Sequence, residues 1–155
     1  MDRRIFLGAA AGLAALPFAA RAQGFNLAPI EPQNPLEQAF VGALTHADMR
    51  PAFRHALVTS PLALALASDA ADAALLFVDV VPRTPGGPPF HAAAVFTSLE
   101  RLFSALGGST PHVVQNGRAV LERLRGQNVV LNYHLLPMLT LEPSDVAGYL
   151  AQPAN

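Results

Sequence analysis

The hydrophobic pattern changes its period in the middle of the chain, within residues 90–108. Over residues 90–96 the pattern alternates, as in a half-buried strand, and over residues 99–106 leucine and phenylalanine recur at the spacing of one helix face. The change falls at Thr97, whose hydroxyl can accept a hydrogen bond from the backbone N–H of Glu100 while the Glu100 carboxylate reaches back to the Thr97 N–H. We therefore expect a strand that runs directly into a helix capped by these two residues.

Helical patterns also open the globular part of the chain. Asn34 is a favourable N-cap, Pro35 suits the first helical position, and apolar residues at helical spacing continue to Leu44. Asp48 can cap a second, shorter helix, which Pro61 prevents from continuing. The pattern thus predicts two helices ahead of the first strand.

Two apolar stretches before residue 90 are predicted to form strands. Leucine and alanine alternate over residues 62–67, and residues 75–81 form an apolar run of strand length, which is typical of a strand at the centre of a sheet. Residues 82–89 are rich in proline and glycine, which predicts a loop that leads into the strand over residues 90–96. Because the connections are short, we expect these three strands to form an antiparallel meander.

The last third of the chain alternates between strand and helix patterns. Strands are predicted over residues 112–115 and 128–132, with a helix between them that ends at Gly126, and a final helix begins in the acidic stretch at residues 142–145. The whole order predicts a mixed α/β (α+β) fold, with a mixed sheet of about five strands covered by helices. We assign it to a single domain over residues 34–152.

The amino terminus has the pattern of an export signal. A pair of arginines is followed by an apolar run that is too short to be a typical transmembrane helix. Small residues then precede a possible cleavage position after Ala22. The motif resembles the twin-arginine signal and consists of Arg3, Arg4, Phe6 and Leu7. We therefore interpret residues 1–22 as a twin-arginine signal peptide and residues 23–33 as a linker; an uncleaved anchor or a general secretory signal is the alternative. The prediction is a periplasmic protein without stable membrane insertion after cleavage.

Composition excludes several classes of chemistry. The chain of 155 residues is 52% hydrophobic and 14% charged, which favours a globular interior over disorder. It contains no cysteine, and all ten of its basic residues are arginine, so thiolate chemistry, iron–sulfur clusters and Schiff bases are excluded. Ten basic and eleven acidic residues without a dense basic run argue against nucleic-acid binding. We expect no cofactor.

The remaining polar residues give only weak signals for a reactive site. The five histidines form no motif with metal-ligand spacing, although His91 and His134 could converge with Asp79 on a metal. No Gly-x-Ser-x-Gly elbow surrounds Ser98, and its position before a helix is explained by capping. The carboxylate of Glu100 could pair with another carboxylate, but the cap already accounts for it. These observations predict that the protein is not an enzyme.

Several stretches together resemble the N-terminal domain of the SseB family, named for enhanced serine sensitivity. The resemblance covers roughly residues 34–150, and Tyr133-His134 stands where the family usually has proline and glycine. Its motif residues are Phe96, Thr97, Ser98, Glu100, Arg101 and Asn132. The resemblance implies no established catalysis and no catalytic residues to carry over, with loose links to secretion and amino-acid stress. From the helical pattern, Arg101 is expected on the exposed side of its helix.

Taken together, these features predict an exported, non-catalytic SseB-like domain that acts through contact with another protein. The alternative is a periplasmic protein that binds a small ligand or metal through the loop at residues 82–89 and the segment Asn132–His134. A hydrolase is a third, weaker interpretation.

Overall fold

The fold is that of a computed structural model in which residues 31–81 and 86–153 are described. The helices in this part of the chain are α2 (Pro35–Thr45), the 3₁₀ helix η1 (Ala47–Met49), α3 (Arg50–Thr59), α4 (Leu99–Leu106), α5 (Gly117–Arg123) and α6 (Pro143–Leu150). The strands are β1 (Pro61–Ala65), β2 (Phe77–Val80), β3 (Phe90–Phe96), β4 (His112–Asn116), β5 (Val129–Leu131) and β6 (Leu139–Leu141). The predicted twin-arginine motif and the cleavage position after Ala22 lie outside the described residues.

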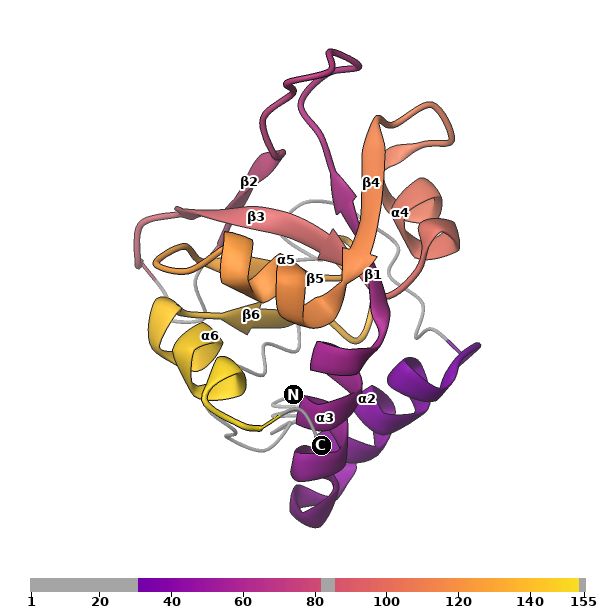
Figure 1. The fold of residues 1–155 in the computed structure, drawn as a ribbon, viewed down its shortest axis with the longest axis vertical. Coiled ribbons are helices and arrows are strands. Elements are labelled where there is room, and N and C mark those ends of the chain that lie inside the picture. Colours follow the sequence, from indigo (N-terminus) through magenta and orange to yellow (C-terminus); the bar gives the residue numbers. More distant parts are fainter. Residues whose placement is uncertain (1–30, 82–85, 154–155) are drawn as a thin grey trace.

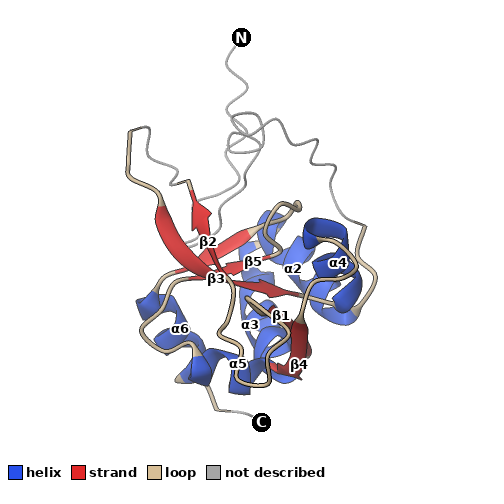
Figure 2. Cartoon of the chain, turned by 90° about the horizontal axis from the view of Figure 1, so that it is seen from above, coloured by secondary structure: helices blue, strands red, loops and turns tan. Residues whose placement is uncertain are grey.

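The strands form one mixed sheet, which confirms the predicted α/β class. The sheet has six strands, one more than expected, in the order β4-β1-β3-β5-β6, with β2 also pairing with β3. β3 and β5 run parallel, and the other described pairs run antiparallel. In Figure 1, α2 and α3 (indigo and purple) lie together below the sheet, and Figure 2 shows the helices arranged around the strands.

Strand β1 has two buried faces of different size, which explains its alternation of leucine and alanine. Leu62 and Leu64 belong to the larger core, which also contains buried residues of α2, α3, α5 and α6. Ala63 and Ala65 belong to a smaller core on the other face, together with Leu102 of α4. Small side chains on this face let α4 approach the sheet closely. The predicted strand is therefore confirmed, but both of its faces are covered.

The first two helices are confirmed, with one correction to their caps. The Asn34 side chain accepts a hydrogen bond from the Glu37 N–H at 2.9 Å, as expected of an N-cap, and Pro35 occupies the first helical position. Asp48, in contrast, lies inside η1, and the residue before α3 makes no side-chain cap. Because η1 leads directly into α3, the Ala47 carbonyl accepts from the Arg50 N–H, so the backbone already satisfies a donor at the start of that helix.

The predicted meander, with residues 75–81 at its centre, is wrong. Ala93 of β3 pairs with both β2 and β5, and Val95 pairs with both β1 and β5, so β1 and β2 follow one another along the same edge of β3. Between themselves, these two strands share an isolated bridge at Leu66 and Leu75. Within the described residues, β2 therefore has a strand neighbour on one side only, and Phe77 within it is 41% exposed. An apolar run was sufficient to predict a strand here but not its place in the sheet.

Strand β6 is not among the predicted strands. It has only three residues and follows Pro137 closely, so no alternation is long enough to indicate it. Leu139 and Leu141 nevertheless enter the larger core as β6 pairs with β5. Tertiary burial thus defines this strand rather than local pattern.

Candidate functional site

The helix that follows β3 is capped by a different residue from the one predicted. The Ser98 side chain is the N-cap of α4 and accepts a hydrogen bond from the Arg101 N–H at 3.1 Å. Glu100 is exposed, and its carboxylate accepts from the Gln33 side chain at 3.2 Å. The capping box of Thr97 and Glu100 is therefore wrong, because the helix begins one residue later and leaves Thr97 outside it.

Thr97 instead faces Asn132 at the carboxyl ends of two parallel strands. These residues directly follow β3 and β5, and neighbouring parallel strands place such positions side by side. The Asn132 side-chain oxygen accepts from the Thr97 backbone N–H at 3.1 Å, and the Thr97 hydroxyl lies equally close to it. Asn132 has a φ of 57°, a left-handed conformation that asparagine tolerates better than most residues. Both residues are buried.

A buried ion pair completes this cluster. The Glu37 carboxylate, which is 0% exposed, accepts from the guanidinium of Arg101 through Nε at 3.0 Å and Nη2 at 3.1 Å. It also accepts from the Thr97 hydroxyl at 2.7 Å and from the Gln33 backbone N–H at 2.8 Å. We call Glu37, Thr97, Arg101 and Asn132 the buried polar cluster. Its members come from α2, α4 and the ends of β3 and β5, so it joins the helices to the sheet.

Arg101 is only 9% exposed, which corrects its predicted place on the solvent side of α4. The prediction assumed that Leu99 marks the buried face, but Leu99 is 36% exposed, and the buried residues of the helix are Arg101 and Leu102. The helix is thus rotated relative to its leucine pattern. The charge of Glu37 supplies the reason, since it binds the guanidinium in the interior.

The electrostatics of the cluster favour a fixed ion pair. Burial by itself raises the pKa of Glu37, but the hydrogen bonds from Arg101, Gln33 and Thr97 outweigh it and hold that pKa below its ordinary value. The same hydrogen bond to Glu37 raises the pKa of Arg101, so both partners are held in their charged forms. A buried carboxylate that already accepts several hydrogen bonds is a poor general base. Phe96 is also fully buried, so Ser98 and Glu100 are the two residues of the predicted family motif that are not buried.

Sequence reasoning assigned Glu37 no place in a candidate site. A signal was present, because Glu37 lies three residues before Phe40, on the apolar face of α2. A charge on an apolar face calls for a buried partner. The identity of that partner was not readable, since Arg101 lies 64 residues further along the chain.

The histidine and carboxylate residues of the metal hypothesis meet only in part. His91 Nδ1 lies 2.9 Å from Asp79 on neighbouring strands, and both side chains are mostly exposed. His134 stacks on Tyr133 instead, and burial lowers the pKa of its imidazole. Within residues 31–81 and 86–153, no three histidine, aspartate or glutamate side chains are grouped so that they could hold a metal ion.

A hollow of about 590 Å³ opens beside the start of α4. Most of its lining is apolar and includes Pro35, Leu36, Pro61, Ala63, Leu99 and Val114, with Thr97 and Ser98 among the polar residues. Leu99 and Val114 are 36% and 46% exposed, and they are two of only four large hydrophobic residues exposed in the described part of the chain. We call this feature the apolar hollow. It lies against β4, the last strand of the sheet.

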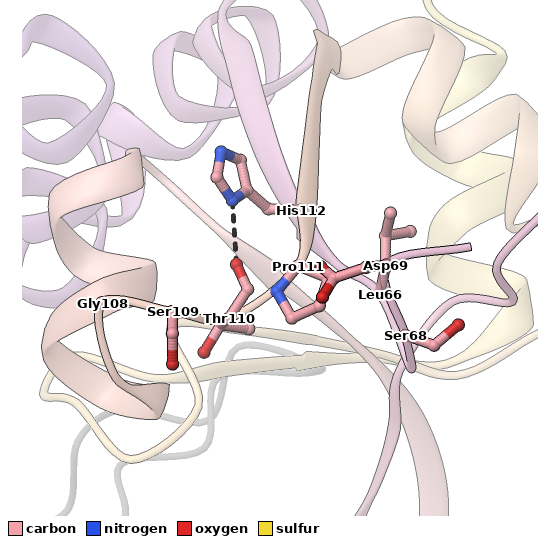
Figure 3. A pocket seen from close by; sticks show the side chains of 8 residues that line it. All are labelled: Leu66, Ser68, Asp69, Gly108, Ser109, Thr110, Pro111 and His112. Carbon is pink, nitrogen blue, oxygen red and sulfur yellow. Dashed lines mark hydrogen bonds between the residues drawn. The ribbon is translucent and has the colours of Figure 1, made fainter. Parts of the chain in front are cut away.

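A second, more polar hollow of about 350 Å³ lies at the other end of β4. Figure 3 shows that the lining residues come from two segments, residues 66–69 and 108–112, and that their side chains point in different directions, with the His112 ring directed away from Ser68 and Ser109. His112 Nδ1 is bound to the Thr110 carbonyl oxygen at 2.9 Å. The side chains therefore form no converging set that could hold a ligand.

Comparisons of the chain with known protein families, curated proteins and solved structures find no match. The resemblance to the SseB family therefore stays a prediction based on the residues quoted above. In the part of the chain that the structure describes, no helix has the length and apolar character needed to cross a membrane.

Proposed function

We propose that this chain is an exported, non-catalytic domain that acts in the periplasm through protein–protein contact. The export part of the proposal comes from the twin-arginine pattern of the sequence. The non-catalytic part is supported by the buried polar cluster, in which the most strongly interacting polar groups bind one another away from solvent. The exposed apolar residues around β4 then favour a role in contact with another protein.

The surface around β4 carries the proposal. Val114 on this strand and Leu99 at the start of α4 are both exposed and line the apolar hollow. Exposed apolar residues that adjoin an unpaired strand are typical of surfaces that bind an extended backbone, because the strand edge supplies hydrogen bonds and the hollow accepts a side chain. The described chain places no strand on the outer side of β4.

Site-specific photo-crosslinking in intact cells tests this function. A photo-reactive amino acid at position 114 should give a discrete protein adduct, because it replaces a side chain at the centre of the proposed surface. The control places the same amino acid at position 125, just after α5, where the native Arg125 side chain is 58% exposed. This control position should give no protein adduct. Adducts at both positions, or at neither, would count against contact through this surface.

Native mass spectrometry of the purified protein separates this function from the ligand alternative. A small apolar molecule retained at one per chain, and lost when Leu99→Arg fills the hollow with charge, would favour a ligand carrier. A protein adduct at position 114 with no retained molecule would favour the proposed contact role.

A further inference from the structure

Three strands have a side without a strand neighbour in the described chain, and they differ in how that side is protected. β6 is only three residues long with both of its leucines buried, and β2 carries the charged Asp79. Short length, charge and proline normally prevent such strands from pairing with other chains. β4 has five residues and contains neither a charged residue nor proline. It is therefore the edge most open to pairing.

The register of β4 shows which of its backbone groups are available. The Leu66 N–H donates to the Pro111 carbonyl and the Gly117 N–H to the Ser60 carbonyl, so these pairs mark the hydrogen-bonded positions between β1 and β4. Hydrogen-bonded positions alternate along an antiparallel pair. Val113 and Gln115 therefore bond to β1. His112 and Val114, which alternate with these residues, therefore direct their N–H and C=O groups outward. The Asn116 N–H also points outward, whereas its carbonyl lies at the N-cap of α5.

We infer that β4 pairs with β4 of a second copy of this chain, antiparallel and about a twofold axis at Val114. This inference rests on the proposed function, because it names the partner of the same surface. The Val114 N–H would donate to the carbonyl of the partner's Val114, and the reverse bond is made by symmetry. The Asn116 N–H would donate to the carbonyl of the partner's His112. The two sheets would then become continuous.

Two properties favour a second copy as the occupant. The outward groups lie at positions 112, 114 and 116, which are symmetric about Val114, so an antiparallel copy presents the same set in reverse. The strand carries no charged residue, so no like charges face one another across the axis. The 46% exposed Val114 side chains would meet at the axis, beside the apolar hollow of each copy.

Sedimentation velocity tests the inference on the protein purified as the cell accumulates it, with its amino terminus determined by mass spectrometry. We expect a dimer that dissociates on dilution over roughly a hundredfold range of concentration. Val114→Pro removes an outward N–H without removing a bond to β1, so it should keep the fold and weaken the dimer by about tenfold or more, since two symmetric hydrogen bonds are lost. Val114→Arg should also give monomers, because it places like charges at the axis.

Two further variants make the test specific. Val113→Pro, one residue earlier, removes a bond to β1 and should lower the melting temperature, which distinguishes outward from inward backbone groups. Phe77→Arg adds the same charge on the exposed part of β2 and should leave the dimer unchanged. A wild-type monomer at every concentration would overturn the inference, and so would a dimer that survives both Val114 variants. A monomer that still gives a crosslink from position 114 to a different protein would overturn the dimer but leave the proposed function standing.

Discussion

Replacing Arg101 with methionine should destabilise the domain strongly. Methionine keeps much of the length of the arginine side chain but leaves the Glu37 carboxylate, which is 0% exposed, without its cation. Removing one partner of a buried ion pair typically costs about 3–5 kcal/mol. Because 11% of the Arg101 side chain reaches solvent, water can partly replace it, and we expect a loss at the lower end, about 3 kcal/mol. Since stabilities of domains are about 5–15 kcal/mol, this is a large fraction.

Urea unfolding followed by circular dichroism measures this loss as a change in the free energy of unfolding. The loss should shrink as the pH falls, because without Arg101 the burial of Glu37 raises its pKa and the carboxylate becomes neutral at a higher pH than in the wild type. The double variant Glu37→Gln/Arg101→Met should be more stable than Arg101→Met alone, since no buried charge remains.

Arg125→Met is the matched control. Arg125 Nε lies 2.6 Å from the Glu122 carboxylate, which is closer than the atoms of the buried pair. The side chains of Arg125 and Glu122 are nevertheless both largely exposed. Exposed pairs contribute little to stability, so this variant should unfold like the wild type. An Arg101→Met loss below about 1 kcal/mol, or one that does not change with pH, would refute the assignment of a buried ion pair.

Three further predictions concern other parts of the chain. The wild-type domain should lose stability as the pH falls from the ordinary pKa of Glu37 through its lowered pKa, because the stabilisation from this carboxylate is fully present only above its ordinary pKa and is lost as it becomes protonated in the folded state. Glu37→Gln should flatten that part of the pH profile, measured by urea unfolding, and an unchanged profile would contradict the reasoning. Gly117→Ala should lower the stability of the fold by about 2–3 kcal/mol, because a Cβ at this position would lie 1.7 Å from the Leu57 carbonyl oxygen. In thermal melts, Gly148→Ala should be neutral or stabilising, because a Cβ at position 148 would have no atom within 4 Å. Replacing Arg3 and Arg4 with lysine should retain the precursor inside the cell, as detected by fractionation, and unaffected export would exclude the twin-arginine route.

Local signals in the sequence determined most of the segments that form helices and strands, although not β6. The cap at Asn34 acts over three residues, and the alternation of residues 62–67 reflects a strand whose side chains point to opposite faces. Such signals need no knowledge of the rest of the chain. For this reason the helices around them and the mixed α/β class could be predicted from the sequence.

Tertiary structure alone decided the order of the strands and the partners of the polar residues. Thr97 could cap a helix or bind a distant side chain, and the choice depends on Glu37, which lies 60 residues away. Arg101 becomes buried because that same carboxylate enters the interior from α2. The place of β4 at the end of the sheet in the described chain is likewise set by its pairing with β1, a strand that lies far from it in sequence. Contacts between distant segments leave no periodic trace in the sequence, and only the folded chain brings these groups together.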